Sequence, residues 1–458
     1  MQRGDAAKDG HVFVSSTSRA ASHGHDARGD VAIGDQPDRV ASYRGGMIEW
    51  SDAHKGIAGM VRKFVEAEVK PNLEALEHGD TPPYDVLRKL FEAFGIRDMG
   101  KMRFEKAVHR AKKREEAAAR GEEPPPAKDR VESGDELAMQ VIPIIELSRY
   151  CPGMVTALGV SVGLTANTIM SRGTARQIER WALDLLTLDK VGAWAITEPG
   201  SGSDAFGSMK STAKRVDGGY VLNGSKTFIT NGPYADTLVF ICKLDEGNDP
   251  KDRKVLSFVL ERGDEGLTCS KPLRKMGLHS SPTGELFLDD VRVPADRLLG
   301  ETEERSYRTG AKDTFTAERT GVAAMALGII EQCISLCVPY AKDRVQFGRP
   351  IGEFQLVQLK LAKMEVARMN VQNLVFRMIG LADQGKRMTL AEASACKLYC
   401  AQSAMEVALE AVQLFGGNGY MAEYQVEQLA RDAKVLQIYG GTDEIQISQI
   451  AREMLWGS

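Results

Sequence analysis

The sequence has little net charge, few histidines and no long apolar run, and each shortage argues against a class of protein. Its 59 Lys and Arg residues nearly balance 63 Asp and Glu residues, leaving a net charge of -4. This balance provides no general attraction to nucleic acid or to an acidic membrane. No apolar run reaches the roughly twenty residues that cross a bilayer, so we expect no membrane span. The seven histidines form no HxxxH or triad arrangement, which leaves metal and serine-type hydrolysis poorly supported.

Cysteines are also few, and their number is odd. Seven cysteines scattered through apolar segments fit a reducing compartment better than a disulfide scaffold, so we expect the cytosol or an equivalent interior. Cys333 and Cys337 lie one helical turn apart, as do Cys396 and Cys400, which is a spacing that metal ligands also show. Neither pair has a histidine nearby, and both lie in apolar helical segments. We therefore predict that they pack in the core and hold no metal.

The length of the chain and its change of pattern predict several packed units. A chain of 458 residues exceeds one ordinary core. Apolar spacing at threes and fours predicts helices in both ends of the chain, whereas turn signals and β-rich runs fill its middle. The fold class is therefore α+β and mostly α, with an N-terminal helical domain at 47–190, a small central β-barrel or sandwich domain at 191–300 and a C-terminal four-helix bundle at 301–458.

Individual elements follow from the same patterns. Strands are predicted at 237–244, 255–260 and 285–288. Long helices are predicted at 322–338, 357–381, 390–415 and 422–438.

Two stretches do not fit these patterns. Residues 1–46 are polar, rich in Gly and Ser and without periodicity, so we expect a disordered tail that is either an upstream start or the remnant of a tag. Residues 101–130 form a charged insertion that ends in three prolines. Its first half has the composition of a basic amphipathic helix for a partner or a membrane surface, but we favour a solvated insertion.

The stretch from Trp194 to Asn231 has the composition of a ligand cradle. A short apolar run leads into Thr197-Glu198-Pro199-Gly200-Ser201-Gly202-Ser203, where glycines open the backbone and hydroxyls cluster. A strand follows that carries Phe228 and Thr230 two positions apart, hence on one face. An aromatic wall beside a hydroxyl suits a planar heterocycle. A solvated loop and an ordinary half-buried strand remain the alternative for either piece alone.

Together the two pieces resemble a known signature. ITEPGSGSD followed by LNGSKTFITNG resembles the flavin-binding signature of the acyl-CoA dehydrogenase family, flavoenzymes that desaturate acyl-CoA thioesters. The resemblance runs from about Ile48 to the C-terminus and implies FAD as cofactor. It implies that Thr197 and Thr230 hydrogen-bond the flavin ring, that Ile196 and Ser203 lie nearby, and that Phe228 forms a wall. It also places Ser203 against the CoA portion of the substrate.

The catalytic base requires a closer comparison with the family. Many members carry a Glu just before Gly-Thr in the C-terminal motif, where this chain has Gly440. A minority branch, which includes the isovaleryl-CoA and long-chain enzymes, carries the base immediately before an Arg on another helix. Glu318-Arg319 matches that pair, and the bare Gly440 leaves space for Glu318. Phe315, Arg319 and Gly440 are then expected in the substrate pocket. The alternative role for Glu318 is to complement a helix dipole.

The resemblance also implies that the cofactor site needs a second subunit. Arg344 and Phe347 lie in a segment resembling the one that reaches the FAD pyrophosphate from the neighbouring subunit, as does the Gly-rich break with Gln413, Gly416 and Gly417. Thr442 and Glu444 complete the adenine end. The protein is thus expected to be an oligomer, typically a tetramer. Taken alone, the Gly-rich break is typical of a helix C-cap.

The sequence therefore predicts an FAD-dependent acyl-CoA dehydrogenase that uses Glu318 as the base and passes electrons to electron-transfer flavoprotein. The expected location is the bacterial cytoplasm, or the mitochondrial matrix in a eukaryote. Two alternatives are a flavin oxidase or monooxygenase of the same fold, and a non-catalytic acyl-CoA-binding subunit. Gly159, in the element that the family places against the acyl chain, weakly favours a branched or longer acyl group.

Overall fold

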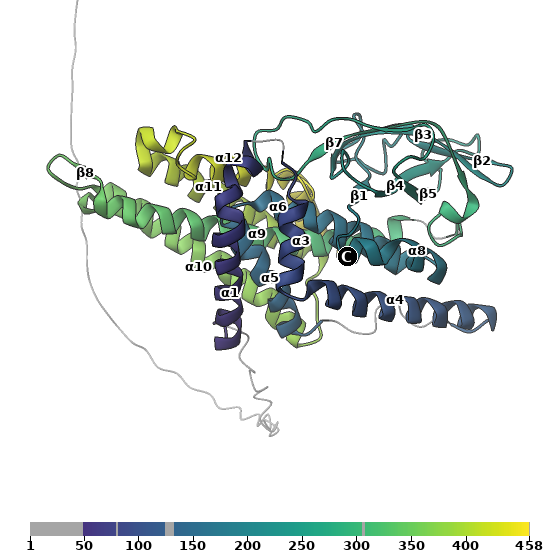
Figure 1. Ribbon diagram of the computed structural model, residues 1–458, viewed down its shortest axis with the longest axis horizontal. Helices are drawn as coiled ribbons and strands as arrows, with labels where there is room; N and C mark the ends of the chain where they lie inside the picture. The colour runs from purple at the N-terminus through teal and green to yellow at the C-terminus, as the bar shows by residue number, and fades with distance from the viewer. Residues whose placement is uncertain (1–48, 79–80, 124–131, 305–306, 458) are drawn as a thin grey trace, which may run out of the picture. The chain divides into compact units, whose positions relative to one another are not determined.

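A computed structural model describes residues 49–78, 81–123, 132–304 and 307–457, without the side chains of 307–315 and 317. The expected disordered tail at 1–46 lies outside the described residues. Residues from Gly45 onward form one compact unit. Its elements occur in three blocks along the chain: helices, then a sheet, then helices, which confirms the predicted fold class (Figure 1).

The first block is helical. It consists of α1 (Asp52–Phe64), the π-helical η1 (Val65–Val69), the 3-10 helix η2 (Lys70–Asn72), α2 (Leu73–Glu77), α3 (Tyr84–Ala93), α4 (Ile96–Ala119), α5 (Gly134–Ser148), α6 (Pro152–Leu158), the π-helical η3 (Gly159–Ala166), α7 (Asn167–Arg172) and α8 (Ala175–Leu186). Ser133 and Thr174 begin α5 and α8 with capping boxes, in which Glu136 and Gln177 return the hydrogen bond to the cap residue.

The middle block is a single curled sheet. Its strands are β1 (Gly192–Ala195), β2 (Thr212–Val216), β3 (Gly219–Thr230), β4 (Thr237–Leu244), β5 (Val255–Glu261), β6 (Leu267–Cys269) and β7 (Thr283–Pro294). They are ordered β1-β4-β2-β3-β7-β6, with β5 paired to β4. β4 pairs in parallel with β1 and β2, and the other pairs are antiparallel. The predicted strands at 237–244 and 255–260 are confirmed as β4 and β5.

The last block contains the long helices. It consists of η4 (Ala295–Arg297), α9 (Tyr307–Asp343), the hairpin β8 (Val345–Gln346) and β9 (Arg349–Pro350), η5 (Ile351–Glu353), α10 (Gln355–Asp383), α11 (Leu390–Phe415), η6 (Gly416–Tyr420), α12 (Val426–Val435) and α13 (Asp443–Trp456). The predicted helix at 390–415 matches α11 at both ends, where Thr389 and Glu392 form a capping box. The predicted helix at 422–438 is shorter in the structure, as α12.

α9 is the central helix of the C-terminal bundle. It packs against α10 and α11 and also against α5 of the first block. Gly328 permits the contact with α5, since a Cβ on this residue would lie 2.2 Å from the carbonyl oxygen of Ile145. Cys333 and Cys337 of α9 share one buried core cluster with Cys396 and Cys400 of α11, and all four thiols are free. Their helical spacing thus places them in the core, as predicted.

Within the described residues, two helical stretches are apolar enough, by length and composition alone, to cross a membrane. They are Pro152–Arg172 and Glu318–Asp343, and 50% and 67% of their most apolar windows are buried inside the folded unit. The core helices of folded domains show the same combination of apolar composition and burial.

The charged tract is folded over its first part. Residues 96–119 form α4, which runs beside α8 (Figure 1). Gly100, Ala107 and Ala111 are buried on the face toward α8, and a Cβ on Gly100 would lie 2.8 Å from the carbonyl oxygen of Leu186. The preference for a solvated insertion was therefore wrong for this part, because small residues at helical spacing let the helix approach its neighbour closely. Residues 124–130 lie outside the described chain.

We expect Ala111→Glu to lower the free energy of unfolding by about 3 kcal/mol, because it would bury a charge without a partner between α4 and α8. The matched control is Lys113→Glu on the exposed face of the same helix, which should change stability by less than about 0.5 kcal/mol. Urea titration followed by far-ultraviolet circular dichroism measures both. Equal effects of the two variants would mean that α4 does not pack on α8.

Candidate functional site

The two halves of the expected cradle are joined by a buried ion pair. Lys226 of β3 donates to Glu198 Oε1 at 2.8 Å and to the carbonyl oxygen of Ile196 at 3.0 Å. Glu198 also accepts from the backbone N–H groups of Lys210 at 2.6 Å and Ser211 at 3.0 Å. The side chains of Glu198 and Lys226 are 4% and 0% exposed. Each charge is thus compensated, and the loop after β1 is fixed to β3.

Burial affects the two partners in different ways. Burial alone would raise the pKa of Glu198, but the Lys226 ammonium and the hydrogen bonds from Ser211 and Lys210 outweigh it and hold this pKa below its ordinary value. Burial lowers the pKa of Lys226, although Glu198 opposes that shift. Sequence reasoning missed this pair. The available signal was weak: a charged residue within each of the two motif segments, among Thr, Ser, Pro and Gly neighbours.

Asn231 is a second anchor that sequence reasoning missed. It adopts a left-handed backbone conformation with φ 64° at the end of β3. Its side-chain amide donates to the carbonyl oxygens of Ala157 and Gly192, both at 2.9 Å, and accepts from the Tyr84 hydroxyl at 2.9 Å. One side chain therefore joins the sheet to α6 and α3.

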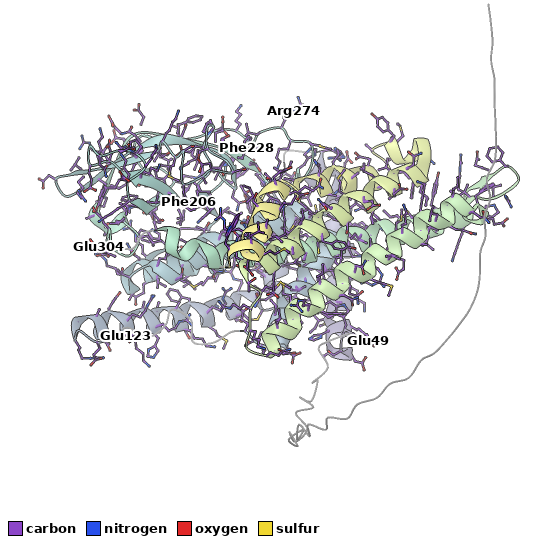
Figure 2. All side chains as sticks on the ribbon, turned by 180° about the vertical axis from the view of Figure 1, so that it is seen from behind. Glu49, Glu123, Phe206, Phe228, Arg274 and Glu304 are labelled. Atoms are coloured by element: carbon purple, nitrogen blue, oxygen red, sulfur yellow. The ribbon has the colours of Figure 1, made fainter. Side chains whose placement is uncertain are left out.

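The cradle residues fit a flat polar ligand. The backbone N–H of Thr227 donates to the carbonyl oxygen of Thr197 at 3.0 Å, which brings Thr197 close to the end of β3. Thr197 and Thr230 are half-buried, and among the described residues neither hydroxyl has a hydrogen-bond partner. Phe228 lies at an irregularity in the pairing of β3 with β7, has φ 57° and is 70% exposed (Figure 2). Two available hydroxyls and an exposed ring thus lie on adjoining segments.

The remaining two predicted residues of this segment differ in exposure. Ile196 is 8% exposed and belongs to the core between the sheet and α8, so its backbone rather than its side chain faces the cradle loop. Ser203 is exposed.

Glu318 and Gly440 meet although they lie far apart in the sequence. A Cβ on Gly440 would lie 3.4 Å from Glu318 Cδ and 3.6 Å from Glu318 Oε1. Glu318 comes from α9, and Gly440 lies in the turn between α12 and α13 with φ 63°. Burial raises the pKa of Glu318, while Arg319 and Lys397 oppose the rise. A carboxylate with an increased affinity for protons thus lies directly over a residue without a side chain.

The turn below Glu318 is held by several groups. Lys397 of α11 donates to the carbonyl oxygen of Gly441 at 2.9 Å. Gln446 donates to the carbonyl oxygens of Gly440 at 3.0 Å and Gly441 at 2.7 Å. Arg319 is 5% exposed and donates to Ser394 Oγ at 2.9 Å. Lys397, Gln446 and Ser394 were not found from the sequence, because each looks like an ordinary residue of a long helix.

Thr442 and Glu444 begin α13. Thr442 is its N-cap and accepts from the Ile445 N–H at 3.4 Å, and Glu444 is exposed in the first turn. The Thr442 hydroxyl lowers the pKa of Glu444. Glu444 therefore stays an ordinary surface carboxylate. The side chain of Phe315 lies outside the described residues.

The other predicted cofactor residues lie away from the cradle. Arg344 and Phe347 belong to the β8–β9 hairpin, and Phe347 is 95% exposed. The exposed Gln413, Gly416 and Gly417 lie where α11 ends. The two groups are near each other. The rings of Tyr340 and Phe415 stack with their centroids 4.0 Å apart, and the side-chain amide of Asn418 donates to the Tyr340 hydroxyl at 3.0 Å. The hairpin lies at the opposite end of α10 from the sheet (Figure 1). Within one chain, this group does not join the cradle.

Metal chemistry finds no support in the described part of the chain, which contains no group of three or more His, Cys, Asp or Glu side chains that could hold an ion.

We expect Lys226→Met to lower the free energy of unfolding by about 3 to 5 kcal/mol, because it leaves Glu198 charged and buried without its partner. The double variant Lys226→Met with Glu198→Gln should recover part of this loss, since the uncompensated charge is then absent. Urea titration measures both. A double variant less stable than Lys226→Met would show that the backbone hydrogen bonds of Glu198, rather than its charge balance, dominate.

Comparison with known proteins agrees with this geometry. Residues 193–291 match the model of the acyl-CoA dehydrogenase middle domain, and residues 309–455 match the model of the acyl-CoA dehydrogenase C-terminal domain. A short-chain specific acyl-CoA dehydrogenase of Megasphaera elsdenii is 40% identical over 69% of this chain and 81% of its own length. A mitochondrial isovaleryl-CoA dehydrogenase of Arabidopsis thaliana is 33% identical over 91% of this chain and 94% of its own length.

A solved structure shows the same fold. A glutaryl-CoA dehydrogenase of Mycobacterium smegmatis in complex with FADH2 superposes with a TM-score of 0.75, at 26% identity, over 89% of this chain and 95% of its own length. The two family models cover the cradle, the Glu318 helix and the Gly440 turn. The chain therefore belongs to the acyl-CoA dehydrogenase family.

Proposed function

We propose that this chain is an FAD-dependent acyl-CoA dehydrogenase that desaturates the Cα–Cβ bond of an acyl-CoA thioester, with Glu318 as the base that removes the α-proton. One observation carries this assignment: the Glu318 carboxylate lies over the bare Cα of Gly440, at the place where many relatives carry their own base. A carboxylate whose pKa burial raises therefore lies in contact distance of a residue that has no side chain.

The environment of Glu318 suits the removal of a carbon-bound proton. A carboxylate in water is too weak a base for this task, and burial strengthens it by destabilising its charged form. Arg319 and Lys397 limit that rise, so that Glu318 can still be ionised before substrate binds. Glu318 accepts the proton, and Lys397 and Gln446 hold the Gly440–Gly441 turn beside its carboxylate.

The cradle would hold FAD. Thr197 and Thr230 offer their hydroxyls to the ring, Phe228 lies against its face, and Ile196 and Ser203 flank the loop. When bound, the flavin supplies the hydride acceptor that no protein side chain provides. The complex of the Mycobacterium smegmatis relative with FADH2 supports this cofactor.

A neighbouring copy would complete the cofactor site. Arg344, Phe347, Gln413, Gly416 and Gly417 are exposed at the far end of the bundle, and Thr442 and Glu444 begin a helix at which an adenosine group can bind. An exposed aromatic ring such as Phe347 is expected to be covered in the assembled protein. We propose a homotetramer in which these residues reach the cradle of another subunit.

The acyl-CoA would bind along Ser203, Phe315, Arg319 and Gly440. A Cβ on Gly159 of η3 would meet no atom within 4 Å, which leaves room for a branched or longer acyl tail. We propose electron-transfer flavoprotein as the acceptor of the electrons, and the bacterial cytoplasm or the mitochondrial matrix as the location. The Arabidopsis relative is a mitochondrial protein.

The base assignment is tested by anaerobic bleaching of the purified yellow enzyme with butyryl-, octanoyl-, palmitoyl- and isovaleryl-CoA. We expect Glu318→Gln to retain FAD but to bleach at least about 100-fold more slowly than the wild type, because the base is lost. Glu331→Gln is a matched control. Glu331 also lies on α9 with a pKa raised by burial, but it pairs with Arg149 at 2.8 Å instead of facing Gly440. This control should bleach like the wild type.

Three outcomes would contradict the proposal. If Glu318→Gln bleaches as fast as the wild type, Glu318 is not the base and only complements the helix dipole. Rapid reoxidation of the reduced enzyme by air, without electron-transfer flavoprotein, would indicate an oxidase or monooxygenase. Protein that stays colourless with added FAD would indicate a non-catalytic subunit.

The fit between Glu318 and Gly440 is tested by Gly440→Ala. The new methyl group would contact the carboxylate, and the left-handed backbone would be strained by about 1 kcal/mol. We expect bleaching to slow roughly tenfold, because a methyl group packed against the carboxylate would hinder the approach of the substrate α-carbon to it. Gly385→Ala is the matched control, with φ 68° and no atom within 4 Å of the new Cβ. It should show the same loss of stability and bleach like the wild type; slow bleaching there would make strain, not contact, the cause.

A further inference from the structure

Lys397 is a charged side chain in an interior position. It lies on α11 and is 0% exposed, among the largest fully buried side chains of the described chain. Burying an ammonium is costly unless it is paired and hydrogen-bonded, so such a residue has a specific task. The proposed reaction assigns Lys397 no role.

Its polar contacts lie in the turn that carries Gly440 and at the start of α13. Lys397 Nζ donates to the carbonyl oxygen of Gly441 at 2.9 Å and pairs with Asp443 Oδ1 at 3.5 Å. Asp443 is in turn fixed by the side-chain amides of Gln402 at 3.1 Å and Gln437 at 3.3 Å. The ammonium therefore connects α11 to the turn and to the start of α13.

The same turn touches Glu318 and its neighbour. The position of a Cβ on Gly440 lies 3.4 Å from Glu318 Cδ, and that of a Cβ on Gly441 lies 3.6 Å from Arg319 Nη2. A shift of the turn would change the space below the carboxylate directly. Both glycines have positive φ, of 63° and 91°, so the backbone there depends on outside contacts for its shape.

The charged and titratable groups that face Glu318 are few. Arg319 comes from α9, Lys397 from α11, and Tyr439 from the turn, while Asp443 acts through Lys397. The Tyr439 hydroxyl donates to the Met325 thioether at 3.2 Å, and burial raises its pKa above its ordinary value. Burial lowers the pKa of Lys397, and Asp443 and Glu318 oppose that shift. Two cations thus face one carboxylate, and Asp443 balances one of them.

We propose that Lys397 is a positioning residue for Glu318: its ammonium holds the Gly440–Gly441 turn below the carboxylate and, together with Arg319, faces that carboxylate with positive charge. The inference rests on the proposed role of Glu318 as base. Lys397 acts through the turn and through its charge, without touching the substrate.

The test compares two variants whose charge changes have opposite signs. Lys397→Met keeps the length of the side chain and removes a positive charge, whereas Asp443→Asn keeps its shape and removes a negative one. Flavin reduction is followed anaerobically in the holoenzyme between pH 5 and 10, with the panel acyl-CoA that bleaches wild type fastest. In wild type the rate should rise with pH as Glu318 loses its proton. The rise should move to higher pH in Lys397→Met, by about one unit, and to lower pH in Asp443→Asn.

A purely structural role for Lys397 would give a different result. Loosening of the turn would reduce the rate at every pH in both variants and leave the position of the rise unchanged, and that outcome would overturn the proposal. A shift in the same direction in both variants would overturn it as well. If Lys397→Met does not fold, Asp443→Asn alone decides, by a shift to lower pH or its absence.

A second measurement needs no turnover. Thermal unfolding midpoints at pH 8 are compared for wild type, Lys397→Met, Glu318→Gln and the double variant. If the two side chains attract each other, the double variant should lose less than the sum of the single losses. Additive losses would overturn the coupling. The proposed function fails separately, if Glu318→Gln bleaches normally. Loss of bleaching in Glu318→Gln, with an unshifted pH profile in Lys397→Met, refutes only the positioning role.

Discussion

The approach of the Glu318 carboxylate to the bare Cα of Gly440 is the contact on which the site depends. It requires a long helix, α9, to pass close to a turn that lies more than a hundred residues later in the chain. No local interaction keeps them together, because two successive glycines with positive φ do not fix the conformation of the turn by themselves. The fixed points are contributed by α11 and α13, through Lys397, Ser394 and Gln446. The helices of the bundle therefore form a hydrophobic core and also hold the turn that lies beside the Glu318 carboxylate.

The cradle uses the same solution with other groups. There, the buried Glu198–Lys226 pair and the amide of Asn231 fix two loops that would otherwise be free to separate. In both places a buried polar side chain with satisfied hydrogen bonds sets the position of an irregular backbone segment. The residues proposed to face the cofactor, such as Thr197, Thr230 and Phe228, are thereby left exposed or without a hydrogen bond from their hydroxyls to the described residues. The remaining proposed cofactor residues lie at the other end of the bundle, which is why we propose that a second subunit completes the site.

Much of this arrangement could be predicted from the sequence. The helix at 390–415 was found because its apolar residues repeat at the helical period. The strands at 237–244 and 255–260 were found because they are β-rich runs separated by Gly, Pro and Asp. The pair Glu318 and Gly440 was predicted from two motifs together. Gly440 stands where many family members carry the catalytic Glu, and Glu318 precedes Arg319 where the other branch of the family carries it. The charged tract was misjudged because its buried residues are glycine and alanine, which hydrophobic periodicity detects poorly.

The sequence by itself determined the order of helices and strands, the small-residue positions and the residue types available for chemistry, since these depend on local period and composition. Only the tertiary structure decided which of them meet. It brought Lys397, 79 residues from Glu318, to the Gly440 turn, paired Glu198 with Lys226, and kept Arg344 and Phe347 away from the cradle of their own chain. The physical reason is that burial and charge compensation depend on neighbours from distant segments, and the sequence of one segment does not specify which neighbours it will have.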